Sequence, residues 1–422
     1  MSHSSILIVL LAFLMFGLLS QRLQSTALTG PMLFAGLGLL IGPAGADFVP
    51  FSITSSTVHM LAEITLILVL FSDAAAIDFR QLRRDHNLPV RMLLIGMPLT
   101  IALTGLTAFV LLTEFTIWEA LLLGAILAPT DAALGQAVIT NPLVPVRIRQ
   151  ALNVESGLND GIALPLVLIF AALAVAGPDA GAPDGFLSDA AIRLAVAPLT
   201  GIFVGYAGGR LVALCYRKAW MSETAEGLIA LALAFGAFQL AEALHGNGFI
   251  SAFVGGLAFG NTLGKKCKFL FEFAESEGQL LILATFMVFG AVMVPIGLDN
   301  FAAPTLIFAI LALTVLRMLP VSVSLFSKGI SALTSAFIGW FGPRGLASIL
   351  FGLLIVEESN VPHKEKILAA TIITVMLSIL LHGFSAASAA RRYGAYARTM
   401  GDCPENMPVS AEPFAQHDAR QV

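Results

Sequence analysis

Four polar residues interrupt an otherwise apolar stretch of the chain, and their types suit the binding of a small cation or a proton. They are Glu155, Ser156, Asn159 and Asp160. Spacings of three to five residues within this set place the side chains on one broad face of a helix. Hydroxyl, amide and carboxylate oxygens are hard ligands of the kind that Na⁺ accepts. The pattern therefore predicts an ion-binding helix face.

The two acids in this set need different roles, because two unpaired carboxylates held close together oppose each other's ionisation. We expect Glu155 to form an ion pair with Arg344, the charged residue of a distant apolar stretch. Asp160 then remains available to bind the transported ion, with Asn159 and Ser156 beside it. The alternative is that both acids are ion-paired and only hold helices together.

Two further apolar stretches are each interrupted by a proline next to a charged residue. Residues 128–131 have the sequence Ala-Pro-Thr-Asp, and residues 342–345 have the sequence Gly-Pro-Arg-Gly. Proline lacks a backbone donor and clashes with the preceding turn, so each helix is expected to break there. A break frees carbonyls that can bind a cation, which only a protein-lined cavity tolerates at membrane depth. A simple proline kink is the alternative, but Asp131 and Arg344 favour half-helix ends whose dipoles they offset.

The composition requires that these residues lie inside a membrane. Of the 422 residues, 57% are hydrophobic and 12% are charged, whereas an ordinary soluble domain has about 25% charged residues. The mean hydropathy of +0.88 shows that the apolar excess is large. These values exclude a cytosolic enzyme, a secreted disulfide scaffold and a disordered protein. The net charge of −4 does not indicate a nucleic-acid partner, and no phosphate loop, zinc spacing or haem motif predicts a cofactor.

About thirteen apolar runs are long enough for transmembrane helices, and they predict an all-α polytopic membrane protein. The predicted spans are residues 5–20, 27–42, 57–77, 89–112, 117–138, 151–176, 188–214, 223–245, 247–262, 277–298, 302–327, 334–356 and 364–389. The first run lacks the basic leader of a signal peptide and is therefore also predicted to be a span. A short polar tail at residues 390–422 is expected to be flexible and cytoplasmic.

Spans one to six and eight to thirteen are predicted to form two repeats, joined by a linker helix at about residues 188–214. Because seven spans precede the second repeat, it is inverted relative to the first. The two interrupted helices are then the fifth helix of each repeat. Matched broken helices in inverted repeats indicate the midplane site of a secondary transporter.

The distribution of lysine and arginine predicts the orientation. Loops after even-numbered spans hold Arg193, Lys364 and Lys366. Seventeen others follow odd-numbered spans, namely Arg22, Arg80, Arg83, Arg84, Arg91, Arg147, Arg149, Arg217, Lys218, Lys265, Lys266, Lys268, Lys328, Arg391, Arg392, Arg398 and Arg420. The positive-inside rule then places the N-terminus outside and the C-terminus in the cytoplasm of a bacterial-type inner membrane. The cysteines at positions 215, 267 and 403 fall on the same, reducing side.

The remaining ionisable residues of the spans are interpreted from their positions. Glu63, Arg210 and Glu242 are predicted to be structural. The last two lie near span ends, where a long side chain can reach the interface. Asp73 approaches the cytoplasmic end of the third span, and it either brings a further acid to the ion site or stays at that end.

The stretch from Leu127 to Pro165 resembles the cation:proton antiporter-1 family, which comprises the NhaP-type bacterial antiporters and the animal sodium/proton exchangers. The resemblance rests on Ala-Pro-Thr-Asp at residues 128–131 and on Glu-Ser-Gly-Leu-Asn-Asp-Gly at residues 155–161. Gly-Pro-Arg-Gly at residues 342–345 also matches, and the likeness covers nearly the whole chain up to the tail.

The resemblance implies a homodimer of thirteen-helix protomers with crossed, broken helices. Each protomer would have an interface part at about residues 1–80 and 223–298. A mobile core part would comprise about residues 89–176 and 302–389.

The resemblance also implies roles for the residues of the ion site. Asp160 would be the exchanged carboxylate, and the pair Asn159-Asp160 would replace the Asp-Asp pair of the electrogenic relatives. The cation would bind near the backbone carbonyl of Thr130 and the hydroxyl of Ser156. An acid of the third span, here Asp73, would complete the site, and Asp131 of the first broken helix is also expected among its cation- and proton-binding residues.

The same resemblance assigns the remaining charges. Glu155 would pair with Arg344 inside the core. Arg317 matches a basic position of the eleventh span and would be a partner of Asp131 on the broken helix.

These roles predict a simple exchange mechanism. A desolvated cavity disfavours a bare carboxylate, so Asp160 would hold either a proton or a cation. The empty anionic site would not cross, because a charge at mid-bilayer costs at least about 2.5–3.5 kcal/mol. Electroneutral exchange of one cation for one proton is therefore expected. Na⁺ is the expected cation, with Li⁺ or K⁺ as alternatives, because the sequence does not set the size of the cage.

Two other functions remain as alternatives. A Na⁺-coupled symporter of a small organic anion would need further arginine or asparagine donors in the core, which the sequence does not show. A non-transporting sensor would be expected to carry a sizeable output domain, and the polar tail is too short for one.

Overall fold

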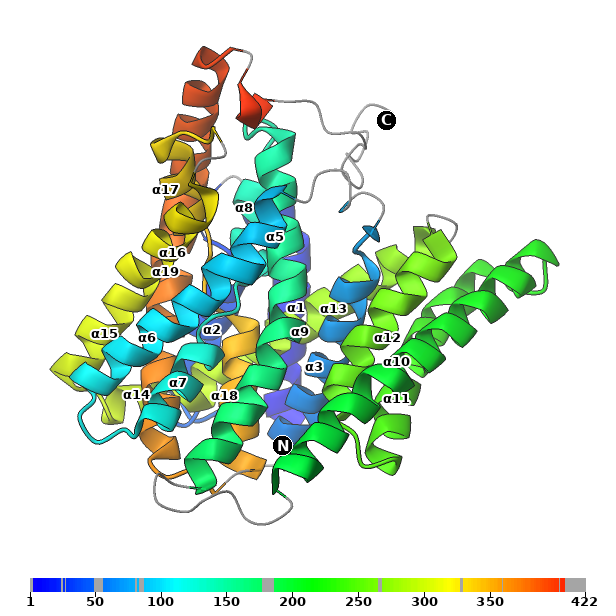
Figure 1. The fold of residues 1–422 in the computed structure, drawn as a ribbon, viewed down its shortest axis with the longest axis horizontal. Helices are drawn as coiled ribbons and strands as arrows, with labels where there is room; N and C mark the ends of the chain where they lie inside the picture. The colour runs from blue at the N-terminus through cyan, green and yellow to red at the C-terminus, as the bar shows by residue number, and fades with distance from the viewer. Residues whose placement is uncertain are drawn as a thin grey trace.

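The structure is a computed structural model that describes residues 3–23, 26, 28–48, 56–79, 82, 87–176, 186–264, 268–326, 329–358, 360–401 and 403–406. Every regular element within these ranges is a helix (Figure 1), which confirms the predicted all-α fold. Some residues that predicted the orientation lie outside the described residues, namely Arg80, Arg83, Arg84, Lys265, Lys266, Lys328 and Arg420. Cys267 and residues 407–422 of the predicted tail also lie outside them.

Eight helical stretches in the described ranges are long and apolar enough to cross a membrane. They consist of α1 (His3–Leu23), α3 (Ser56–Ala75), α5 (Asn87–Arg91) with η1 (Met92–Gly96) and α6 (Met97–Leu111), α9 (Val146–Ala176), α10 (Phe186–Arg217), α13 (Lys268–Val288) with η3 (Phe289–Met293) and α14 (Val294–Asp299), α15 (Ala303–Leu313) with α16 (Val315–Leu325), and α19 (Lys364–Thr399). The shorter helices are α2 (Gly30–Ile41), α7 (Ile117–Ile126), α8 (Ala132–Ile139), α11 (Glu223–Ala243), α12 (Gly248–Leu263), α17 (Ala332–Trp340) and α18 (Leu346–Glu358). These helices coincide with the predicted spans, while the count of thirteen membrane crossings stays a prediction.

The fifth and twelfth predicted spans are both broken, as the sequence predicts. An unwound segment separates α7 from α8 and contains Pro129, and another separates α17 from α18 and contains Pro343. In Figure 1, α8 and α17 lie in the upper half of the molecule and α7 and α18 lie in the lower half. The two broken helices therefore run in opposite directions and cross where they are unwound, as expected for inverted repeats.

A third break, between α15 and α16, was not predicted. At Thr314 the backbone leaves the helical region, with φ −113° and ψ −96°. The Thr314 hydroxyl donates to the Ile310 carbonyl at 2.7 Å, and such bonds compete with the helical ladder. Pro320 supplies no backbone donor in the following helix. The break places Arg317 in the first turn of α16.

The helices gather into two groups on either side of α3 and α9 (Figure 1). Helices α10, α11 and α12 lie on one side, and α6, α15 and α16 lie on the other. Gly256 and Gly260 of α12 face the carbonyls of Phe71 and Ala75 on α3, where a Cβ would overlap the backbone. These glycines therefore serve close packing within the protomer. The assignment of interface and core parts stays a prediction.

The C-terminal helix is longer than predicted. The tail was expected to begin at residue 390, but α19 continues to Thr399. Ala390, Tyr393 and Ala397 are buried at helical spacing, so this end of α19 has an apolar face to pack. The chain then turns back through η4 (Pro404–Asn406), where the Glu405 carboxylate accepts the Ser331 N–H at 2.8 Å.

Candidate functional site

The two unwound segments touch each other through a backbone hydrogen bond. The Asp131 N–H donates to the Pro343 carbonyl at 2.8 Å. This contact joins the first broken helix directly to the second. A proline carbonyl in an unwound segment has no helical partner, so the crossing supplies one.

The Asp131 carboxylate caps two half-helices at once. Its Oδ1 accepts the Ala133 N–H at 2.8 Å, in the first turn of α8. Its Oδ2 accepts the Leu346 N–H at 2.7 Å, at the start of α18. Both helices therefore direct their positive N-terminal ends at one carboxylate, which is the dipole role that the sequence predicts for Asp131.

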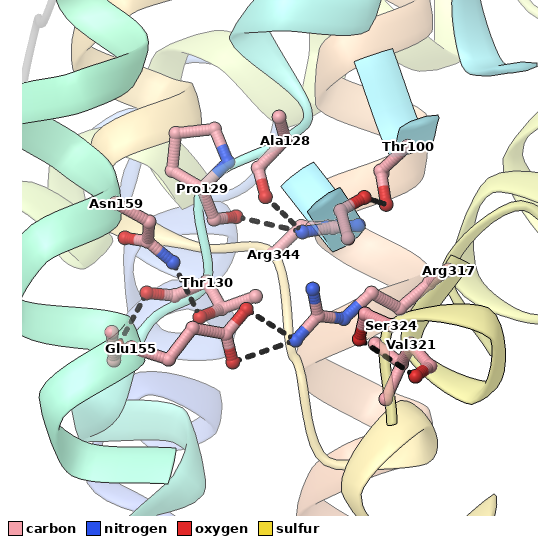
Figure 2. A network of polar contacts seen from close by, with 12 residues as sticks. Thr100, Ala128, Pro129, Thr130, Glu155, Asn159, Arg317, Val321, Ser324 and Arg344 are labelled. Carbon is pink, nitrogen blue, oxygen red and sulfur yellow. Dashed lines mark hydrogen bonds and ion pairs between the residues drawn. The ribbon is translucent and has the colours of Figure 1, made fainter. Parts of the chain in front are cut away.

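Arg344 binds the opposite kind of helix end. Its Nη1 donates to the Ala128 carbonyl at 2.5 Å and to the Pro129 carbonyl at 3.0 Å (Figure 2). These carbonyls follow the C-terminal end of α7, which carries partial negative charge. The predicted ion pair between Arg344 and Glu155 is therefore wrong, because the guanidinium is directed at the freed carbonyls of the other broken helix.

Glu155 forms its ion pair with Arg317 instead. The Arg317 Nη2 lies 2.6 Å from one carboxylate oxygen and 2.7 Å from the other (Figure 2). Both residues are 1% exposed. The predicted pairing of Arg317 with Asp131 is also wrong, since three backbone amides bind the Asp131 carboxylate. The break in front of α16 brings Arg317 to α9, and the sequence contains no strong signal for that break.

Thr130 is held by two side chains of α9. The Asn159 amide donates to the Thr130 hydroxyl at 2.7 Å (Figure 2). The Ser156 hydroxyl donates to the Thr130 carbonyl at 2.5 Å. The structure thus brings together three of the residues that the sequence predicts around the ion. A small cavity beside them is lined by Thr130, Asp131 and Ser156, among others.

Asp160 differs from the other acids of the site. Its Oδ1 is buried and has no hydrogen-bond partner, and no ion pair involves Asp160 among the described residues. Asp73 and Asp131 are the charged groups that act on it electrostatically. The alternative in which both α9 acids are ion-paired therefore holds for Glu155 but fails for Asp160.

Helix α3 brings Asp73 to the same region. A Cβ on Gly157 of α9 would lie 3.7 Å from the Asp73 carbonyl oxygen. Asp73 is half-buried and acts electrostatically on Asp160. Its position next to α9 favours the reading in which it adds an acid to the site.

The residues predicted to be structural make ordinary contacts. Glu242 accepts the Gly248 N–H at 2.7 Å and so helps to start α12. Arg210 donates to the Tyr206 hydroxyl at 2.7 Å on an exposed face of α10. Glu63 is exposed. Within the described part of the chain, none of these three forms a hydrogen bond or an ion pair with the broken helices.

Sequence reasoning missed three residues that hold the crossing. Ser348 donates to the Ile126 carbonyl at 2.7 Å, which joins α18 to the last residue of α7. Ser378 and His382 of α19 contact the second break directly. The serines resemble ordinary helical serines in the sequence, but a histidine within an apolar span was a usable signal.

Comparisons with known proteins agree with this arrangement. The family model described as "Sodium/hydrogen exchanger, transmembrane" matches residues 6–392. The K(+)/H(+) antiporter NhaP of Alkalimonas amylolytica is 26% identical over 378 residues, which cover 89% of this chain and 63% of that protein. The Na(+)/H(+) antiporter ApNhaP of Aphanothece halophytica is 25% identical over 370 residues, which cover 84% of this chain and 69% of that protein.

A solved structure shows the same fold. The sodium proton antiporter MjNhaP1 from Methanocaldococcus jannaschii, determined at pH 8, aligns with a TM-score of 0.73 and 21% identity. The alignment covers 92% of this chain and 98% of that one.

The K(+)/H(+) antiporter NhaP2 of Shewanella sp. (strain ANA-3) is 26% identical over 364 residues, which cover 85% of this chain and 62% of that protein. The chain thus spans less than two thirds of the length of the two K(+)/H(+) relatives.

Proposed function

The chain belongs to the sodium/hydrogen exchanger family, and from this premise we propose that it exchanges a monovalent cation for a proton by alternating access. The observation that carries the proposal is the Asp160 carboxylate. It has a buried oxygen without a hydrogen-bond partner and lies on the helix that packs against the crossing of two broken helices. A buried acid that no base neutralises needs a cation or a proton.

The coupling follows from competition for this one carboxylate. A proton and a cation cannot both neutralise Asp160, so binding of one releases the other. The Thr130 carbonyl, the Ser156 hydroxyl and Asp73 supply further hard oxygens near it, which suit a monovalent cation. The site then crosses the membrane loaded with either ion, because a bare charge in hydrocarbon is strongly unfavourable.

The charges around Asp160 support electroneutral exchange of one cation for one proton. Glu155 is neutralised by Arg317 at 2.6 Å. The Asp131 carboxylate is bound by backbone amides of two helix ends. Asn159 adds an amide and no charge beside Asp160. With these groups fixed, and with Asp73 in one protonation state throughout the cycle, the charge of the moving site stays the same when a proton replaces a cation.

The identity of the cation belongs to the proposal. The names of the relatives divide between K(+)/H(+) and Na(+)/H(+) antiport. Na⁺ is our first candidate, and K⁺ and Li⁺ are the ions to compare with it. No observation favours a symporter of an organic anion, because both buried arginines of the site are already engaged by Glu155 and by backbone carbonyls.

We also propose an assembly and an orientation. Leu10, Leu14 and Leu18 of α1 are exposed, so this helix presents an apolar surface that fits lipid or a second copy of the chain in a homodimer. The N-terminus would face outward and the C-terminus the cytoplasm of a bacterial inner membrane. Labelling of single introduced cysteines from either side of intact cells would test this orientation.

Proton flux in proteoliposomes tests the proposed function. The purified protein is reconstituted with a pH-sensitive dye, and Na⁺, Li⁺ or K⁺ is added outside. Cation-dependent proton movement that an imposed membrane potential leaves unchanged is the expected result. Turnover driven by the potential alone would contradict electroneutral exchange, and no proton movement with any of the three cations would contradict antiport.

A further inference from the structure

His382 lies on α19 directly against the break between α17 and α18, and the exchange mechanism above gives it no role. The ring is 1% exposed. Its Nε2 lies 2.8 Å from the carbonyl oxygen of Trp340, the last residue of α17. Its Nδ1 lies 3.2 Å from the hydroxyl of Ser378, one helical turn earlier. That hydroxyl accepts the Arg344 N–H at 2.7 Å.

The two backbone groups at the ends of this chain of contacts are four residues apart. In a continuous α-helix the Arg344 N–H would donate directly to the Trp340 carbonyl. The unwound segment separates these two partners. The side chains of Ser378 and His382 stand between them and connect them by another route. Together they replace the one helical hydrogen bond that the break removes.

The ring nitrogens of His382 face three oxygens. Besides the Trp340 carbonyl at Nε2, the Nδ1 lies 2.9 Å from the backbone carbonyl of Ser378 and 3.2 Å from its hydroxyl. A proton on Nε2 lets the ring donate to the Trp340 carbonyl, which the break leaves without its helical partner. The Ser378 hydroxyl oxygen accepts the Arg344 N–H at the same time.

The connection matters because water is scarce at membrane depth. An unpaired carbonyl or N–H in the bilayer core costs several kcal/mol, so a broken helix there needs side chains to satisfy its ends. Pro343 prevents a regular helix here, but it does not fix the geometry of the unwound segment. If the contacts to α19 were lost, the Trp340 carbonyl and the Arg344 N–H would lack partners, and the segment would shift to satisfy them in another way. Such a shift would move Arg344 away from the Ala128 and Pro129 carbonyls, and Pro343 away from Asp131.

We propose that His382 and Ser378 are positioning residues of the exchange site, which hold the unwound segment of the second broken helix in place by substituting for its missing Trp340–Arg344 hydrogen bond. This role rests on the proposed function, since the open crossing holds Thr130 in place for the cation. Neither residue touches the ion. Their effect passes through Arg344 to the carbonyls that precede Thr130.

Three variants test the proposal in reconstituted protein. His382→Leu fills similar space without polar atoms, His382→Gln keeps an N–H that can donate to the Trp340 carbonyl, and Ser378→Ala removes a single hydroxyl. Ser388→Ala is the matched control, because that hydroxyl is exposed on α19 and donates to the Ser385 carbonyl of its own helix. Transport is measured against cation concentration, with the amount of folded protein determined by size-exclusion chromatography.

We expect His382→Leu and Ser378→Ala to raise the KM for the cation about tenfold, the effect of one lost buried hydrogen bond. His382→Gln and Ser388→Ala should stay within about threefold of the wild type. The Leu and Ala substitutions together should act no more strongly than the stronger of them alone, because both interrupt one chain. Two results would overturn the proposal. One is an unchanged KM in Ser378→Ala, and the other is a rise in KM that is as large in His382→Gln as in His382→Leu.

Hydrogen exchange at residues 341–346 separates this proposal from the proposed function. The Arg344 amide should exchange faster in Ser378→Ala than in the wild type or in Ser388→Ala. This holds even if no cation drives proton flux, in which case the proposed function fails and the positioning role is decided by exchange alone. Equal exchange in Ser378→Ala and the wild type would contradict the role that we assign to Ser378. If His382→Leu does not fold, the KM and the hydrogen exchange of Ser378→Ala still test the proposal.

Discussion

The Asp131 carboxylate accepts the Leu346 N–H at 2.7 Å, although 215 residues separate the two in the sequence. The other oxygen of the same carboxylate caps α8. One acid therefore joins the N-terminal ends of two half-helices that belong to different repeats. The Asp131 carboxylate at the crossing is bound at both oxygens, in contrast to Asp160, the acid that we propose to carry the ion.

Asp131→Ala should lower the free energy of unfolding by about 1 kcal/mol for each of the two caps that it removes. Asp131→Asn keeps one acceptor oxygen, so its free energy of unfolding should fall by about half as much. Thermal unfolding in detergent measures both variants. Asp299→Ala is the control, because Asp299 is exposed at the end of α14. Equal stability of Asp131→Ala and the control would show that the caps do not hold the crossing.

Removing one member of the Glu155–Arg317 pair should strongly destabilise the protein. Glu155→Gln or Arg317→Gln leaves a buried charge without its partner, which costs about 3–5 kcal/mol. The double variant should lose less stability than the two single variants lose in sum, since it leaves no unpaired charge. The double-mutant cycle is measured by thermal unfolding. Additive losses would mean that the two residues do not act as a pair.

Asn159→Asp should make exchange sensitive to the membrane potential. The substitution adds a carboxylate beside Asp160, so a second group could bind a proton in the cycle. Asn159→Ala is the matched control, because it loses the same contact to the Thr130 hydroxyl and adds no charge. Transport is recorded in proteoliposomes with and without a valinomycin-imposed potential. The electroneutral account fails if the wild type or Asn159→Ala responds to the potential as strongly as Asn159→Asp.

The C-terminal turn should detach only in acid. Burial acts to raise the pKa of Glu405, but hydrogen bonds, the first of them from the Ser331 N–H, outweigh it and lower the pKa from the usual 4.5. A lowered pKa means that ionised Glu405 stabilises the fold above pH 4.5, and that this stability is lost as the pH falls through the folded-state pKa.

Hydrogen exchange of residues 400–406 measures this attachment. We expect constant protection between about pH 6 and pH 8, and a loss of protection below about pH 4. Glu405→Gln should show weaker protection at all of these values and no acid transition. A loss of protection near neutral pH in the wild type would show that a group other than Glu405 controls the attachment of the turn.

Several of these features could be predicted from the sequence because a local chemical cause produces them. Pro129 and Pro343 lack a backbone donor, and each stands within two residues of a charged residue, so the breaks between α7 and α8 and between α17 and α18 were predictable. Pro165, which has no charged residue so near, lies inside the continuous helix α9. The spacing of Ser156 and Asn159 put them on one helix face, and the structure places both against Thr130.

The partners of the buried charges could not be predicted in the same way. Arg317 and Arg344 lie in distant spans, and which of them reaches Glu155 depends on an unwound residue, Thr314, whose type is common in regular helices. Arg344 was assigned to a carboxylate, whereas the crossing gave it backbone carbonyls that exist only once the helix has broken. Such pairings depend on distances between helices, which a single sequence does not contain.

Asp160→Asn in proteoliposomes tests the central claim most directly. The variant keeps the size of the side chain and removes the charge that both ions must neutralise, and Asp299→Asn serves as the control. Proton movement is recorded after pulses of Na⁺, K⁺ and Li⁺, with the reconstituted protein quantified. We predict that cation-dependent proton movement disappears in Asp160→Asn and persists in the control. Cation-driven proton exchange that survives in Asp160→Asn would contradict the account.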